Sequence, residues 1–125
     1  MSAHGTVHWN ELNTHDVEKA KAFFAQTLGW AYEAMPMPEG TYWIIRSGEA
    51  TVGGIFELKG AAFEGVPEHW LTYVAVDDVD ARSKKARAAG AKLERAPFDV
   101  PGVGRIAIVQ LPGGAMMGWM TPAQG

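Results

Sequence analysis

The apolar residues of this chain follow two spacings, and the two spacings alternate in an order that occurs twice. Between residues 17 and 28 apolar side chains return every three or four positions, which predicts a helix with one buried face. Segments rich in aromatic and β-branched side chains lie on both sides of it and predict strands, at residues 7–14, 30–35, 41–46 and 50–58. A polar linker at 59–68 leads to the second set, a strand at 70–76, a helix at 79–89, and extended segments at 92–98, 105–111 and 115–120.

Residues at the ends of these elements indicate an internal repeat. Asp16 and Asp78 stand where an N-cap is expected before each helix, and a glycine follows each helix. A shift of 61 positions pairs His8 with His69, whereas a shift of 62 pairs Asp16 with Asp78. We therefore predict the order β-α-β-β-β twice in one domain over residues 1–125, with repeat one at about 5–58 and repeat two at about 69–122.

Composition narrows the class of protein. The 125 residues are 47% hydrophobic and 20% charged, which is the balance of one globular domain with its own core. A net charge of −3, with dispersed lysines and arginines, is unlike a nucleic-acid-binding surface. The chain has no cysteine, which excludes disulfides and thiolate sites. No apolar run approaches the roughly 20 residues that span a bilayer, and residues 1–6 lack the features of a signal peptide, so we expect a cytoplasmic protein without a membrane partner.

Three stretches carry motifs that are known together from one superfamily: ELNTHDVEKAKAFFAQTLGW, TYVAVDDVDARSKKARAAGAKL and VQLPGGAMMGWM. Through them the chain resembles the vicinal-oxygen-chelate superfamily, which includes glyoxalases, bleomycin-resistance proteins and extradiol dioxygenases. The resemblance implies an α+β fold in which two tandem βαβββ units form curved mixed sheets around a cavity, with the helices outside. Because members range from isomerases and dioxygenases to drug-sequestering proteins, the fold alone does not choose the function.

In metal-bearing members of this superfamily, His, Glu, His and Glu side chains on four cavity-facing strands hold a divalent ion. Position by position, the resemblance puts Trp9, Glu57, Leu71 and Gly118 at these places. Since only Glu57 keeps a ligand group, we expect no metal cofactor.

An alternative ligand set remains open. The shift of 61 positions that pairs His8 with His69 would combine both with Glu57, and two histidines with a carboxylate can hold Fe(II) or another divalent ion. Alternation along a strand argues against this set, because His8 faces away from the cavity if Trp9 faces into it. The two remaining histidines are interpreted as surface or hydrogen-bonded side chains.

A cavity without metal would be lined by aromatic side chains and a few polar groups, as small-molecule sites usually are. Strand alternation places Glu11 on the same side as Trp9, and a carboxylate between apolar neighbours would have a raised pKa and could act as a general base. Glu11 could equally pair with a lysine or arginine at the rim. The ligand-binding residues that we predict are Trp9, Asn13, Trp43, Glu57, Leu71, Tyr73 and Trp119, although tryptophans such as Trp43 and Trp119 are more often core residues.

Three functions therefore compete. The first is a metal-independent protein that binds a small organic molecule, with or without acid–base chemistry through Glu11. The second is a divalent-metal-dependent lyase, isomerase or dioxygenase that uses His8, Glu57 and His69. The third is a non-catalytic drug-sequestering protein of the bleomycin-resistance type. The resemblance also implies a homodimer, because relatives of this length often pair.

Overall fold

The computed structural model describes residues 3–38 and 40–123, and its elements follow the predicted order. Internal contacts divide the chain into two compact units: Trp9–Trp70, and the residues up to His8 together with those from Leu71 onwards. We call these the first-repeat unit and the second-repeat unit. The architecture is mixed α+β, as predicted, whereas the assignment of both units to one domain stays a prediction.

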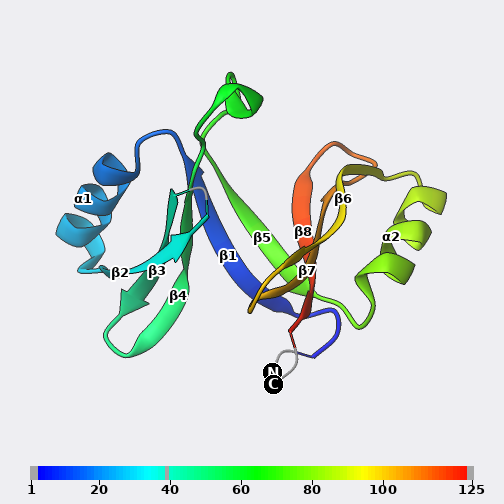
Figure 1. The fold of residues 1–125 in the computed structure, drawn as a ribbon, viewed down its shortest axis with the longest axis horizontal. Helices are drawn as coiled ribbons and strands as arrows, with labels where there is room; N and C mark the ends of the chain where they lie inside the picture. The colour runs from blue at the N-terminus through cyan, green and yellow to red at the C-terminus, as the bar shows by residue number, and fades with distance from the viewer. Residues whose placement is uncertain (1–2, 39, 124–125) are drawn as a thin grey trace. The chain divides into compact units, whose positions relative to one another are not determined.

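The first-repeat unit is a four-stranded sheet with a helix packed on one face (Figure 1). Its strands lie in the order β2-β3-β4-β1, with the bounds β1 (Val7–Thr14), β2 (Ala31–Met37), β3 (Gly40–Ser47) and β4 (Ala50–Glu57). Strand β1 runs parallel to β4, and the other neighbouring strands are antiparallel. Strand β2 continues through Pro36 to Met37, beyond the predicted end at residue 35, and Glu39 lies outside the described residues.

Helix α1 (Val17–Leu28) begins and ends where the sequence predicts. The Asp16 carboxylate accepts a hydrogen bond from the backbone N–H of Lys19 at 3.1 Å, and Gly29 ends the helix with a φ of 70°, which a residue without a Cβ adopts without strain. Ile45 and Ile55 are fully buried in the cluster beneath the helix. Each such burial contributes about 1.5–3 kcal/mol to the free energy of unfolding, so this apolar layer fixes the face that α1 covers.

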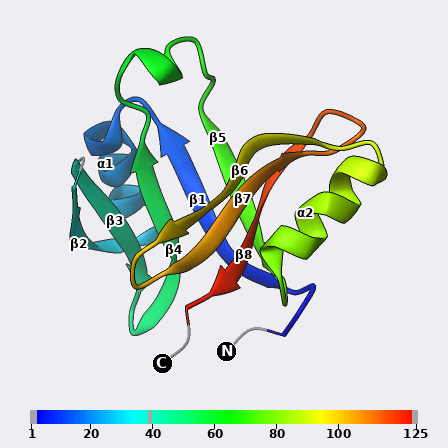
Figure 2. The same ribbon diagram turned by 45° about the vertical axis from the view of Figure 1, so that its right-hand side comes forward.

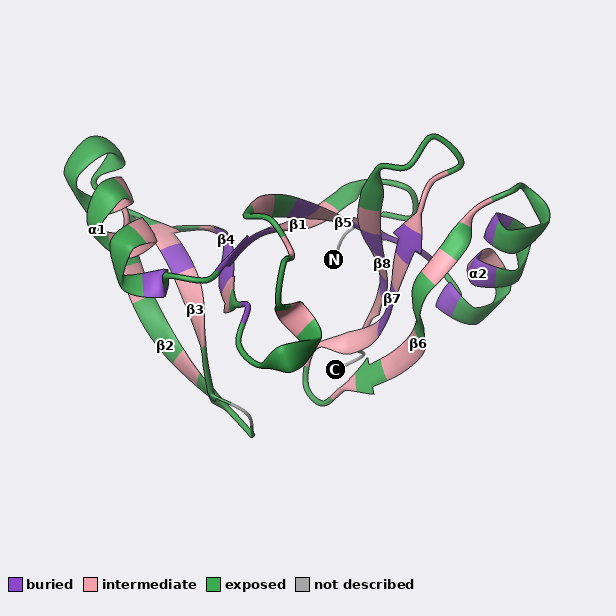
Figure 3. Cartoon of the chain, turned by 90° about the horizontal axis from the view of Figure 1, so that it is seen from above, coloured by how far each residue is buried: buried purple, intermediate pink, exposed green. Residues whose placement is uncertain are grey.

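The second-repeat unit repeats this plan (Figure 2). Its strands lie in the order β5-β8-β7-β6, with the bounds β5 (His69–Ala75), β6 (Lys92–Val100), β7 (Gly104–Gln110) and β8 (Met116–Pro122). Asp78 caps helix α2 (Val79–Ala88) by accepting from the backbone N–H of Ala81 at 3.1 Å. The buried residues of α2, Val79, Ser83 and Ala86, mark the side that packs on the strands (Figure 3).

Strand register shows how the two repeats correspond. In the parallel pair of β1 with β4, Glu11 stands opposite Gly54, and in the parallel pair of β5 with β8, Tyr73 stands opposite Gly118. The two N-caps, Asp16 and Asp78, are 62 positions apart in the sequence. A shift of 62 positions also makes Glu11 correspond to Tyr73. The pairing of His8 with His69 by a shift of 61 is therefore corrected: on the structural register His8 corresponds to Trp70.

The predicted linker contains a short 3₁₀ helix, η1 (Ala61–Phe63), whose Phe63 ring makes an edge contact with the ring of Phe56 at 5.6 Å between centroids. The linker therefore packs on the end of β4. Neither α1 nor α2 is long and apolar enough to cross a membrane, and the same holds for every helix in the described part of the chain.

Candidate functional site

The two faces of the first-repeat sheet carry different kinds of side chain. Residues that pair across strands share a face, so Leu12, Ile55 and Trp43 lie on the face that α1 covers. We call it the helix face. Glu11 and Gly54 pair in the next register position and therefore lie on the opposite face, which we call the distal face.

Two polar side chains of β1 are buried on the distal face. Only 8% of Glu11 and 5% of Asn13 is exposed, although both are residue types that usually lie in water. The side-chain amide of Asn13 donates to the backbone carbonyl of Glu11 at 3.3 Å. Burying a carboxylate costs free energy unless hydrogen bonds or an opposite charge compensate it. Ionisable side chains in such surroundings are often found at catalytic or binding sites.

Tyr42 lies beside these residues and was missed by the sequence analysis. Its hydroxyl accepts a hydrogen bond from the indole N–H of Trp9 at 2.8 Å. A side chain at position 54 would overlap the ring of Tyr42, so Gly54 leaves the space in which that ring lies. The neighbouring Gly53 has a separate role, because a Cβ there would meet the backbone carbonyl of Asn10. A close approach of two backbone segments therefore explains the glycine at position 53.

Three of the predicted ligand-binding residues lie on helix faces instead of beside Trp9. Trp43 packs against the α1 cluster, with the Lys21 ammonium 3.4 Å from the centre of its ring. Glu57 pairs with Thr14, which shares the helix face with Leu12. Trp119 packs against the cluster beneath α2. Placing Trp43 and Glu57 on the same face as Trp9 is therefore corrected, and on this geometry we expect neither side chain to contact a ligand on the distal face. A role of Trp119 in binding stays a prediction.

On the distal face of the second-repeat sheet the corresponding residues are mostly apolar. Leu71 and Tyr73 are 5% and 7% exposed, and Ala75 follows them on the same face. The ring of Tyr73 lies over Gly118, where any added Cβ would overlap it. This unit thus also packs a tyrosine ring over a glycine, but Tyr73 stands at the position that Glu11 has in the first repeat.

The superfamily's metal does not fit this chain's residues. Trp9, Leu71 and Gly118 offer no ligand atom at the expected places, and Glu57 lies on the helix face. Within residues 3–38 and 40–123, no three His, Asp or Glu side chains gather as a metal site would require. The imidazole Nδ1 of His69, a member of the alternative set, lies 2.8 Å from the carbonyl oxygen of Pro67.

The histidine at the start of α1 has a structural role. The two ring nitrogens of His15 lie 3.1 Å from the carbonyl oxygen of Leu58 and 2.6 Å from that of Val66, so the imidazole lies between the residue before the linker and the second half of the linker. The backbone N–H of His15 also donates to the Glu68 carboxylate at 2.6 Å. Hydrogen bonds from the Thr14 side chain and from this N–H lower the pKa of Glu68.

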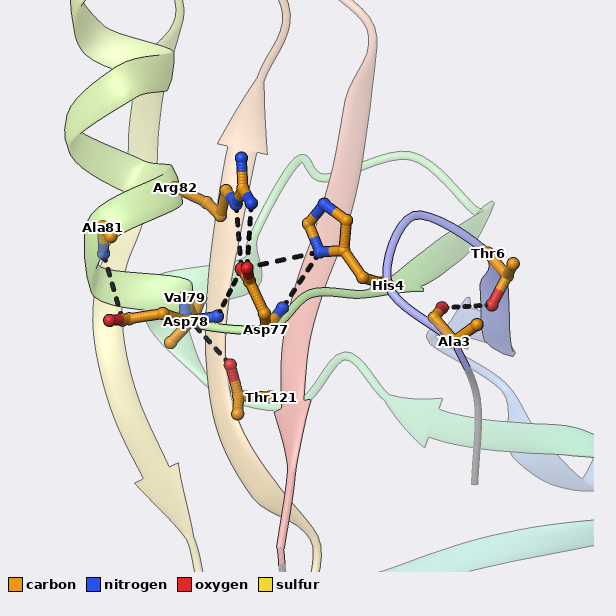
Figure 4. A network of polar contacts seen from close by, with 9 residues as sticks. All are labelled: Ala3, His4, Thr6, Asp77, Asp78, Val79, Ala81, Arg82 and Thr121. Carbon is orange, nitrogen blue, oxygen red and sulfur yellow. Dashed lines mark hydrogen bonds and ion pairs between the residues drawn. The ribbon is translucent and has the colours of Figure 1, made fainter.

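A second polar cluster stands at the start of α2 (Figure 4). The Arg82 guanidinium donates two hydrogen bonds of 2.9 Å to the Asp77 carboxylate and thereby holds the pKa of that carboxyl far below its usual range. The backbone N–H of Asp77 donates to Nδ1 of His4 at 3.0 Å. The interpretation of His4 and His15 as hydrogen-bonded side chains is therefore confirmed.

Comparison with curated proteins gives relatives of similar sequence. The chain is 41% identical over 120 residues to a Mycobacterium tuberculosis protein named "Putative glyoxylase CFP32", a match that covers 95% of this chain and 45% of that protein. It is 30% identical to the anthracycline biosynthesis protein DnrV of Streptomyces peucetius, over 90% of this chain and 46% of that protein. The chain thus spans less than half the length of these relatives.

Solved structures share the fold at low sequence identity. Methylmalonyl-CoA epimerase of Mycobacterium tuberculosis matches with a TM-score of 0.65 at 15% identity, over 99% of this chain and 94% of that one. The hypothetical protein BH1468 of Bacillus halodurans matches with a TM-score of 0.71 at 11% identity, over 98% of both chains. A family model, described as the Glyoxalase/Bleomycin resistance protein/Dioxygenase superfamily, matches residues 6–117. The chain therefore belongs to this superfamily.

Proposed function

We propose that this chain binds a small organic molecule on the distal face of the first-repeat sheet, without a metal ion. The observation that carries the proposal is the pair of buried polar residues, Glu11 and Asn13, on the strand where Trp9 stands at the place of the superfamily's first metal ligand. Polar groups placed among aromatic side chains are the usual means by which a pocket orients a small ligand.

Glu11 is the proposed general base. An ionised carboxylate accepts a proton from a bound hydroxyl or an acidic C–H, and Asn13, two residues further along the same face, can hold an oxygen of the same ligand by its amide N–H groups. Leu71 and Tyr73 stay predicted ligand contacts. The names of the relatives suggest two kinds of ligand to try: a hemithioacetal for a glyoxylase, and an anthracycline for DnrV.

Binding in the presence of a chelator tests the metal-independent proposal. Purified protein is treated with EDTA, its metal content is measured, and daunorubicin is titrated while the quenching of its fluorescence is followed. We expect saturable binding that adding Zn²⁺, Ni²⁺ or Fe²⁺ does not change. A stoichiometric ion whose removal abolishes binding, and which His69→Ala also releases, would instead support a metal-dependent lyase, isomerase or dioxygenase built on His8, Glu57 and His69.

Product analysis separates an enzyme from a drug-sequestering protein of the bleomycin-resistance type. Each ligand that binds, including the hemithioacetal of methylglyoxal and glutathione, is incubated with the protein and analysed by mass spectrometry. A new product that disappears in Glu11→Gln supports catalysis, whereas unchanged ligand released from both proteins supports sequestration.

We also propose a homodimer in the cytoplasm. Pairing of two copies is what the resemblance to the superfamily implies. Light scattering after gel filtration tests this, and a monomer mass at micromolar concentration would contradict it.

A further inference from the structure

Tyr42 crosses a strand to reach its partner. It stands on β3, whereas Trp9 stands on β1, and β4 runs between these two strands. The hydroxyl of Tyr42 nonetheless lies within hydrogen-bond distance of the Trp9 indole N–H, at 2.8 Å. The crossing is possible because the residue of β4 beneath the ring is Gly54, whose Cα carries no side chain.

We propose that Tyr42 is a positioning residue of the ligand site: it fixes the indole of Trp9, and the two rings form the surface on which a flat aromatic ligand stacks. This inference rests on the proposed function and names its ligand class. The ligand would be a planar aromatic molecule that bears a hydroxyl or another hydrogen-bond donor.

The chemistry of the surrounding side chains supports this ligand class. Aromatic rings favour offset-stacked or edge-to-face contacts with other rings, and Ile44, on the same face, adds apolar surface to Trp9 and Tyr42. Glu11 follows Trp9 on this face, and an ionised carboxylate only accepts hydrogen bonds, so it selects a donor such as a phenol.

Fixing the indole strengthens binding because a ring that is held in advance loses less conformational entropy when the ligand arrives. The hydrogen bond from Trp9 to Tyr42 is between neutral groups and half-buried, so losing it should weaken binding about two- to tenfold. A side chain at position 54 should have a larger effect, because it displaces the whole Tyr42 ring rather than one atom of it.

The first experiment uses Tyr42→Phe, with Tyr32→Phe as its matched control. Tyr32 also loses a side-chain hydrogen bond, to the carbonyl of Lys21 at 3.1 Å, but it packs against the helix-face cluster. The indole N–H resonance of Trp9, assigned by its absence in Trp9→Phe, is followed by ¹⁵N NMR alongside daunorubicin affinity. We expect Tyr42→Phe to move the resonance and weaken binding, and Tyr32→Phe to do neither.

The second experiment uses Gly54→Ala, with Gly113→Ala as its control. Position 113 has open space around an added Cβ, so that substitution tests the loss of a glycine without a clash. We expect Gly54→Ala to weaken daunorubicin binding more than tenfold and Gly113→Ala to leave it unchanged. Should Gly54→Ala fail to fold, Tyr42→Phe decides the inference.

The outcomes separate this inference from the proposed function. If the wild type binds daunorubicin while Tyr42→Phe changes neither the Trp9 resonance nor the affinity, the inference is overturned and the proposed function stands. If the wild type binds only a non-aromatic ligand, such as the hemithioacetal, the aromatic ligand class is overturned alone. If the wild type binds no small molecule, the proposed function and the ligand class both fall, and the Trp9 resonance still decides whether Tyr42 holds the indole.

Discussion

The distal faces of the two sheets carry different side chains at corresponding positions. Strand β1 presents Trp9, Glu11 and Asn13, and strand β5 presents Leu71, Tyr73 and Ala75. The element order and the N-capped helix are common to both repeats, whereas the tyrosine packed over a glycine comes from β3 in the first repeat and from β5 in the second. Two units can therefore share an order of elements and a capped helix while the buried acidic and amide groups lie in one of them.

The positions just before the two helices show a similar division. Asp77 corresponds to His15, because both directly precede an N-cap. The imidazole of His15 contacts the carbonyl oxygens of Leu58 and Val66, whereas Asp77 pairs with Arg82 in the first turns of its own helix. The same place in the fold therefore anchors a connection in one repeat and a helix in the other.

The largest expected effect is on stability, and it comes from the apolar packing between a helix and its strands, which both repeats have. Ile55 is fully buried beneath α1, so Ile55→Ala should lower the free energy of unfolding by about 3 kcal/mol through lost burial and the cavity it leaves. Urea denaturation followed by circular dichroism measures this. Because Ile55 lies on the helix face, the Ile55→Ala protein that remains folded should bind daunorubicin as the wild type does. Weaker binding by the folded variant would contradict the assignment of the ligand site to the distal face.

A smaller effect is expected at Gly118, where the second repeat places a ring over a glycine. Gly118→Ala would press on the buried ring of Tyr73 and should cost about 1–3 kcal/mol of stability. Thermal denaturation of Gly118→Ala is compared with that of Gly113→Ala, which replaces a glycine without a clash, so the difference between the two variants measures the clash. If Gly118→Ala instead abolishes ligand binding at full stability, the second repeat carries a necessary ligand contact and the comparison between the repeats fails.

The smallest expected effect is the pH dependence of stability that comes from the ion pair of Asp77 with Arg82 at the start of α2. Arg82 lowers the pKa of Asp77, so the ionised carboxylate stabilises the folded state; this contribution is fully present above the ordinary value of 3.8 and is lost as pH falls further. Asp77→Asn should therefore reduce the melting temperature at neutral pH, and the difference from the wild type should shrink on acidification below 3.8. Arg82→Gln should behave in the same way, and a difference independent of pH would contradict this account.

Local signals in the sequence predicted the elements well, because caps and spacings act over a few residues. Asp16 and Asp78 fixed both helix starts. The faces of side chains were harder to predict, since they depend on register between strands. A register shift lies between Ile45 and Arg46, and no local pattern distinguished Tyr42 from Trp43 as the residue on the distal face. The pair Gly53-Gly54 was an available signal, because a glycine inside a strand often marks a place that another group approaches closely. At Gly54 that group is the ring of Tyr42.

The most direct test of the account compares Glu11→Gln with Glu57→Gln. Both substitutions remove one carboxylate from the first repeat, but Glu11 lies on the distal face and Glu57 on the helix face. Daunorubicin is titrated into both variants after EDTA treatment. The account predicts that Glu11→Gln weakens binding about tenfold or more, as for the loss of a charged hydrogen-bond acceptor, while Glu57→Gln binds like the wild type. Loss of binding in Glu57→Gln with full binding in Glu11→Gln would contradict it.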